Sequence, residues 1–155
     1  MIKKIFLALL IIFGIAQFFN PEKNESTELL SSDLVVTEKP NDRIKAMLHN
    51  ACYDCHSNHT NYPWYDRITP VNFWVQGHVD HGKGELNFSL WSTFSPKKKI
   101  HKLEECIELI EKGEMPLESY TIMHGDAKFD ETEKKELLNW LQLVKIKHET
   151  TNLPM

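Results

Sequence analysis

The motif Cys52-Tyr53-Asp54-Cys55-His56 constrains this chain more than any other feature, because one chemistry has to account for three reactive side chains in five residues. Four explanations are available for a cysteine pair followed by a histidine: a disulfide, a structural zinc site, a redox-active dithiol and a covalent haem attachment site. They differ in what they require elsewhere in the chain.

The first three explanations each lack a required partner. A structural zinc site needs four ligands, but there is no second cysteine pair, Cys106 stands alone, and scattered histidines would have to complete the site. A thioredoxin-type dithiol lies at the start of a helix in a βαβ unit, whereas here a helical pattern precedes the cysteines. A plain disulfide would leave His56 without a role.

Haem attachment accounts for every residue of the motif. In C-x-x-C-H the two cysteine sulfurs form thioethers with the haem vinyl groups, and the adjacent imidazole becomes the proximal iron ligand. The sequence therefore predicts one haem c per chain, held by Cys52 and Cys55 and ligated by His56.

The N-terminus has the pattern of an export signal. Lys3 and Lys4 precede an apolar run over residues 5–19 that only Gly14 and Gln17 interrupt. Fifteen helical residues extend about 22 Å, less than the ~30 Å hydrocarbon core of a bilayer. Residues 14–16 offer a cleavage site, so residues 1–19 are either a removed signal peptide or a membrane anchor; a buried helix is the third alternative. We expect an exported, periplasmic protein with possible membrane attachment through residues 3–19.

The rest of the chain suffices for one small domain. Residues 20–40 are polar and acidic and are expected to form a flexible linker, residues 41–147 a haem-binding domain, and residues 148–155 a C-terminal tail. Of the 18 basic residues, two lie in the leader, which leaves 16 against 22 acidic ones. This acidic balance, without a basic stripe, argues against a nucleic-acid partner.

Hydrophobic periodicity predicts a mostly α domain with four helices and no strand. The expected N-caps are Asn41 or Asp42 for the first helix, Thr69 before Pro70 for the second, Ser95 before Pro96 for the third, and Asp130 with Glu133 for the fourth. The first is expected to lead directly into Cys52, the second to end at Gly82 and the third to end at residues 112–113.

Between residues 50 and 94 aliphatic side chains are sparse and aromatic ones are frequent. Long aromatic loops of this kind need something to pack against, and a large flat cofactor meets that need. Trp64, Tyr65 and Trp91 are therefore candidate walls of a haem pocket, with ordinary structural packing as the alternative.

Several further motifs follow one another along the chain: Cys-Tyr-Asp-Cys-His-Ser-Asn, Tyr62-Pro63-Trp64-Tyr65, Ile68-Thr69-Pro70, Leu86-Asn87-Phe88-Ser89-x-Trp91 and Gly113-Glu114-Met115-Pro116 with Tyr120 and His124. Together and in this order they resemble a known family, the bacterial haem-binding domain family of small exported c-type mono-haem proteins. The likeness covers about residues 41–143. It implies a small cytochrome c-like helical domain wrapped around its haem.

The second axial ligand decides the chemistry of the iron. Met115 follows the third helix in a Met-Pro loop, an order that resembles small cytochromes c, and thioether ligation suits electron transfer. His124 in the same loop is the alternative distal ligand. His78, His81 and an open site remain as further alternatives, and Met115 as core filler is the plain explanation.

The leading functional hypothesis is one-electron transfer in the cell envelope with an unidentified redox partner protein. A haem-based ligand sensor with an open or labile distal site is the second hypothesis. A peroxidase is the third, and it would need a distal acid–base group that no motif supplies. The sequence thus favours a haem protein that is not an enzyme.

Overall fold

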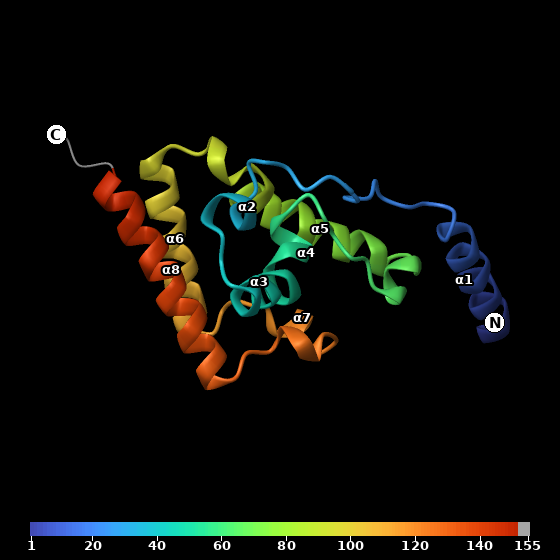
Figure 1. Ribbon diagram of the computed structural model, residues 1–155. Coiled ribbons are helices and arrows are strands. Elements are labelled where there is room, and N and C mark those ends of the chain that lie inside the picture. The colour runs from blue at the N-terminus through green and yellow to red at the C-terminus, as the bar shows by residue number, and fades with distance from the viewer. Residues whose placement is uncertain (152–155) are drawn as a thin grey trace.

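The computed structural model describes residues 1–151 and consists of helices joined by loops, as Figure 1 shows. The prediction of a mostly α domain is confirmed, and residues 1–151 contain no strand apart from one isolated bridge between Glu25 and His59. The helices are α1 (Ile2–Ala16), α2 (Leu34–Glu38), α3 (Asp42–Leu48), α4 (Asp54–His56), α5 (Val71–Glu85), α6 (Pro96–Glu111), α7 (Glu118–Thr121) and α8 (Glu131–Thr151).

Four helical segments that are not α-helical complete the fold. The segment η1 (His49–Tyr53) is π-helical and joins α3 to α4, so that one helical rod leads into the CxxCH motif as the periodicity predicts. The other three are 3₁₀ turns: η2 (Trp64–Arg67), η3 (Phe88–Thr93) and η4 (Gly125–Ala127).

Three of the four predicted caps are confirmed; the exception is Thr69, because α5 begins at Val71 with Pro70 in the cap position and no side-chain cap. Asn41 accepts a hydrogen bond from the Ile44 amide, and Ser95 accepts one from the Lys98 amide. Asp130 accepts from the amide of Glu133, whose carboxylate in turn accepts from the Asp130 amide, so both halves of a capping box are formed. These local signals hold because each cap satisfies backbone groups within its own first turn.

The helices α6 and α8 run antiparallel and lie side by side, forming one wall of the domain (Figure 1). Their inner faces meet α3 and the core residues of the CxxCH rod. The core is built from fully or nearly fully buried apolar side chains of six segments: Leu34, Ile44, Met47, Leu48, Tyr53, Phe88, Trp91, Leu103, Ile110, Leu137, Leu141 and Val144.

Part of the segment expected to be a flexible linker, residues 20–40, is packed on the domain, with residues 33–35 buried and residues 25–29 exposed. Asp33 is buried and caps α2, and its carboxylate accepts a 2.6 Å hydrogen bond from the Tyr53 hydroxyl inside the CxxCH motif. Upstream, Asn24 donates to the Ser57 carbonyl and the Thr60 hydroxyl. These polar residues find partners distant in sequence, which local composition does not reveal.

A second difference lies at the C-terminus, where a tail from residue 148 is expected. Helix α8 continues to Thr151, and His148 is anchored to a buried carboxylate; residues 152–155 of the expected tail lie outside the described residues. Helix α5 is expected to end at Gly82, but it continues to Glu85, and Gly82 lies in the helix interior.

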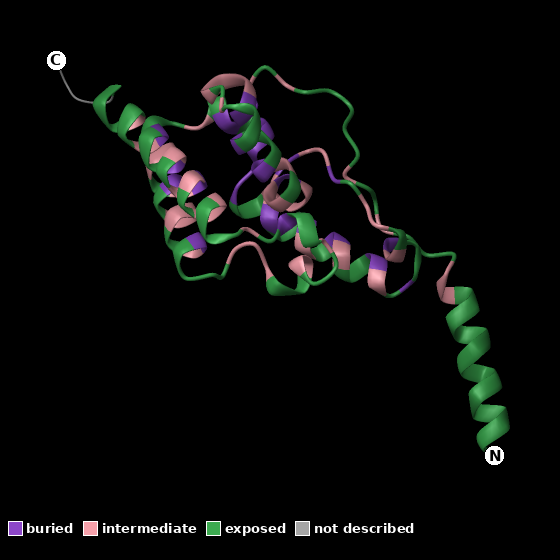
Figure 2. Cartoon of the chain, turned by 60° about the horizontal axis from the view of Figure 1, so that its bottom comes forward, coloured by how far each residue is buried: buried purple, intermediate pink, exposed green. Residues whose placement is uncertain are grey.

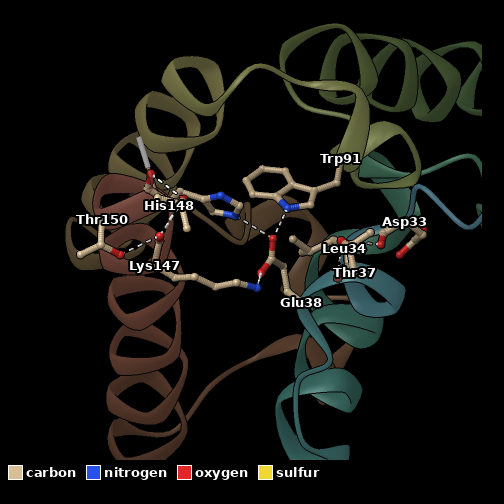
Figure 3. Close-up of polar contacts among 9 residues, drawn as sticks. Asp33, Leu34, Thr37, Glu38, Trp91, Lys147, His148 and Thr150 are labelled. Atoms are coloured by element: carbon tan, nitrogen blue, oxygen red, sulfur yellow. Dashed lines mark hydrogen bonds and ion pairs between the residues drawn. The ribbon is translucent and has the colours of Figure 1, made fainter. Parts of the chain in front are cut away.

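Glu38 holds the two ends of the domain together, as Figure 3 shows. Its side chain is 3% exposed and accepts hydrogen bonds from Trp91 Nε1 at 2.8 Å, His148 Nε2 at 2.7 Å and Lys147 Nζ at 2.8 Å. Burial raises the pKa of Glu38, but these three donors outweigh it and hold the pKa below its ordinary value. The ionised carboxylate is therefore the form that the fold stabilises.

We expect Glu38→Gln to lower the free energy of unfolding by about 2 kcal/mol at neutral pH, because it weakens charge-assisted bonds to a buried acceptor. Because the pKa of Glu38 is lowered in the folded state, the ionised carboxylate stabilises the fold at pH values above the ordinary carboxyl pKa. This stabilisation is lost as the pH falls through the lowered pKa. The difference in the free energy of unfolding between wild type and variant, measured by urea unfolding, should thus shrink below about pH 4.5.

Glu108→Gln, at an exposed ion pair with Lys112, is the control and should change the free energy of unfolding little. Equal pH profiles for wild type and Glu38→Gln would contradict this role.

The helix α1 projects from one end of the domain and has no buried residue; Figure 2 shows it in the exposed colour except at the end nearest the domain. Within residues 1–151, no helix combines the length and the apolar character needed to cross a membrane.

Candidate functional site

The CxxCH motif borders a cavity of about 360 Å³, a volume within the roughly 300–1,000 Å³ range of cofactor and small-molecule sites. Cys52 and His56 line it from the motif, Phe88 from η3 and Met115 from the loop after α6. Its remaining wall comes from the end of α5, from α6 and from the loop before α8; the apolar members are Leu86, Leu109, Ile110, Pro116 and Phe129.

His56 is oriented by a backbone acceptor. Its Nδ1 lies 3.0 Å from the Leu86 carbonyl oxygen, just after the end of α5, so Nδ1 carries the hydrogen and Nε2 is left with its lone pair. Histidine ligands of metals commonly donate their second ring N–H to a carbonyl in this way, which fixes the tautomer and the ring plane. Burial lowers the pKa of His56, which favours the neutral imidazole that binds iron.

Gly82 lets α5 approach the motif. A Cβ built at this position would lie 2.6 Å from the Cys55 carbonyl oxygen and 3.0 Å from its Cβ, too close for any other residue without a backbone shift. The close approach brings the Leu86 carbonyl, four residues later, to His56. Sequence reasoning assigned Gly82 only the end of a helix, and no local signal indicates its packing role.

The two motif cysteines lie on different sides of this turn. Cys52 lines the main cavity, whereas Cys55 lines a smaller hollow of about 50 Å³ together with Tyr65, His78 and His124. Burial raises the pKa of Cys52 to about 12 and that of Cys55 to about 11, so both thiols are protonated at neutral pH. Both thiols are free in the structure.

The structure separates the two predicted distal ligands. Met115 is partly buried in the wall of the main cavity that contains His56. His124 stacks on Tyr120 with ring centroids 4.0 Å apart, its Nδ1 lies 3.0 Å from the Tyr120 carbonyl, and it lines the smaller hollow. Tyr120 in turn donates to Asp54 of the motif at 2.7 Å. His124 thus lies beside the motif but not in the cavity of His56.

The three aromatic side chains predicted as pocket walls lie elsewhere. Trp91 is fully buried in the core, where it bonds Glu38, and Tyr65 lines the smaller hollow. Trp64 is 70% exposed. Of the aromatic residues in the stretch 50–94, Phe88 lines the main cavity instead, and it also stacks on Tyr53.

A charged rim borders the cavity on its α5 and α6 side. Lys102 lies between Glu85 at 3.5 Å and Glu105 at 2.6 Å, and the hydrogen bond from Lys102 to Glu105 raises the pKa of the lysine. His81 and Cys106 also line the cavity. Sequence reasoning named His81 as an alternative distal ligand but gave Lys102, Glu85 and Glu105 no role, because α5 and α6 are brought together only by the fold.

The donor set suits haem and not a free metal ion. The cavity offers the oriented imidazole of His56, the thioether of Met115 and the thiol of Cys52 among apolar side chains, with His81 and Cys106 also in its lining. This set fits an iron porphyrin with its flat apolar ring. By contrast, residues 1–151 contain no cluster of three or more His, Cys, Asp or Glu side chains placed to hold a metal ion alone.

Comparison with known proteins agrees with this chemistry. The model of the haem-binding domain family matches residues 11–143, which begins thirty residues before the resemblance visible in the motifs and includes the packed segment before Asn41. No curated protein and no solved structure matches the chain. With most of its length matched and an oriented histidine in a cofactor-sized cavity, the chain belongs to the haem-binding domain family, and its cofactor is haem.

Proposed function

We propose that this chain is an exported c-type haem protein that transfers single electrons, with one haem per chain bound through Cys52 and Cys55. The observation that carries the proposal is the cavity that His56 and Met115 both line, with His56 oriented by the Leu86 carbonyl. When bound, the haem iron supplies the one-electron chemistry between its ferric and ferrous states.

Attachment requires no oxidant. Each cysteine sulfur forms a bond to one vinyl carbon of the haem, and the thiol hydrogen ends on the neighbouring carbon, so that two C=C bonds become two thioethers. Cys55 follows Cys52 by three residues, about one helical turn, in a continuous helical segment, with Cys52 in the wall of the main cavity and Cys55 in the adjoining smaller hollow. The free state of both thiols is compatible with this chemistry.

His56 and Met115, as the two axial ligands, would set the reduction potential of the haem and exclude other ligands from its iron. His56 donates its Nδ1 hydrogen to Leu86, which keeps Nε2 available for iron in both redox states. Met115 supplies a soft neutral sulfur that stabilises ferrous iron and closes the second face against exogenous ligands. The apolar lining from Leu86, Phe88 and Phe129 keeps water from the ring, which further favours the less charged ferrous form.

Met115→Ala is expected to open the iron. Most of the ferric protein should become high-spin, the ferrous form should bind carbon monoxide, and the reduction potential should fall because the thioether is lost. His124→Ala is the matched control from the same loop and should keep the wild-type spectrum, since His124 lies in the other hollow. Absorption spectra with and without carbon monoxide measure these changes.

Three outcomes would contradict the assignment. If His124→Ala opens the iron and Met115→Ala does not, ligation is by two histidines and the potential is lower. If neither variant changes the spectrum, His81→Ala becomes the decisive variant because His81 lines the same cavity. A wild-type protein that is already high-spin and binds carbon monoxide would replace electron transfer by ligand sensing.

A further inference from the structure

One end of the domain carries a group of exposed apolar side chains that do not line the main cavity, although Trp74 also borders the smaller hollow that contains Cys55. Trp64 is 70%, Phe73 48% and Trp74 52% exposed, and Ile68 lies between them in sequence. They come from η2 and from the first turn of α5, the end of the molecule nearest to α1 in Figures 1 and 2. We call these four residues the aromatic end.

The chain fixes the base of α1 beside the aromatic end. The Gln17 side chain donates to the Thr69 carbonyl at 3.1 Å and accepts from the Thr69 amide at 2.9 Å. The Thr69 hydroxyl donates to the Phe19 carbonyl at 3.0 Å, and Asn72 donates to the Asn20 side chain at 3.1 Å. Because Thr69 lies between Ile68 and Phe73, the apolar helix and the aromatic end are held next to each other.

The surface formed in this way needs an apolar environment. Helix α1 exposes isoleucine, leucine and phenylalanine on all its sides, which is unfavourable in water. Phe18 and Phe19, both exposed, continue this surface to the aromatic end. Nothing in residues 1–151 covers it.

The composition of the aromatic end fits the interface of a lipid bilayer. Tryptophan is enriched where a bilayer meets water, because its ring is apolar and its N–H remains hydrated. Within the described chain, the indole N–H groups of Trp64 and Trp74 make no hydrogen bond, whereas that of buried Trp91 does. Arg67, exposed on η2 and without an ion pair among residues 1–151, is positioned to meet lipid phosphates.

We propose that the aromatic end rests on the surface of a lipid bilayer, with Trp64 and Trp74 at headgroup depth and α1 in the apolar layer beside them. Eleven residues of α5 separate Val71 from Gly82, about 17 Å at 1.5 Å per residue. The haem cavity at the far end of α5 is thereby held away from the lipid and open to a water-soluble partner. This contact does not depend on how the haem is attached.

Brominated lipids test the proposal, because they quench tryptophan fluorescence only where the ring enters the bilayer. The full-length haem-loaded chain is placed in vesicles of equal parts phosphatidylcholine and phosphatidylglycerol, with or without bromine near the headgroup end of the acyl chains. The haem quenches tryptophan fluorescence equally in both samples. Dividing the emission with brominated lipid by the emission without it therefore cancels the contribution of the haem. Wild type should be quenched, and W64F/W74F should lose this quenching several-fold.

Trp140→Phe is the matched control, since Trp140 packs against the core from α8. This variant should keep the lipid-dependent quenching, and the haem spectrum should be unchanged in all variants, which separates this test from that of the proposed function. Equal quenching in W64F/W74F and wild type would overturn the proposal. So would vesicle-bound wild type without any quenching, because the aromatic end would then face away from the lipid and toward a protein.

Discussion

Replacing Gly82 by alanine is expected to disturb the haem site more than any other single-methyl change in α5. The added Cβ would meet the Cys55 carbonyl oxygen at 2.6 Å, and a backbone atom cannot rotate away as a flexible side chain can. Helix α5 must then move from the motif, carrying the Leu86 carbonyl away from His56. We expect a loss of about 1–3 kcal/mol in the free energy of unfolding and a lower yield of haem-loaded protein.

The same helix provides two matched controls. Gly77 and Gly84 have no atom within 4 Å of an added Cβ. Gly77→Ala and Gly84→Ala should therefore stabilise the protein by up to about 1 kcal/mol each, because alanine restricts the unfolded chain and favours the helix. Three chemically identical substitutions thus have opposite expected signs. Urea unfolding and the ratio of haem absorbance to protein absorbance measure both effects.

A Gly82→Ala variant as stable and as haem-rich as the two controls would contradict this packing. It would mean that α5 lies farther from the motif than the structure shows, and the orientation of His56 by Leu86 would lose its support.

The parts of the fold that could be predicted are those that local chemistry decides. The caps at Asn41, Ser95 and Asp130 were correct because the bonds they make stay within one helical turn. The helix expected after Ser95 likewise forms as α6, and its apolar residues Leu103 and Ile110 lie in the core. These patterns need no knowledge of which helix packs on which.

The failures arise where a partner lies far along the chain. Residues 20–40 look like a polar linker, yet Asp33 and Glu38 are buried because Tyr53, Trp91 and His148 satisfy them from distant segments. The π-helical turn at residues 49–53 has no sequence signal either, although such turns frequently occur at functional sites.

In the candidate site, too, the residues with a local signal could be predicted and those placed by tertiary contacts could not. The CxxCH motif is local, so His56 and the two cysteines could be named from five residues. Met115 and His124 share a loop, and only the tertiary structure places the first in the wall of the cavity and the second outside it. Trp64 was expected near the haem because large aromatic residues usually pack, but its exposure is better explained by a surface role.

The covalent bond between Cys52, Cys55 and the haem is the central claim, and its loss is the largest effect we expect. If both sulfurs hold the ring, as we propose, acid–acetone should remove no haem from wild type, and the intact mass of the polypeptide should include it. In Cys52→Ala/Cys55→Ala no thioether can form, so any haem held by His56 alone should extract completely.

Cys106→Ala supplies the control, because Cys106 lines the same cavity but lies outside the motif. The decisive measurement is therefore acid–acetone extraction followed by intact mass analysis of these three proteins. Our account predicts that haem stays with wild type and Cys106→Ala and leaves the double variant. Haem that extracts freely from the wild-type chain would contradict it.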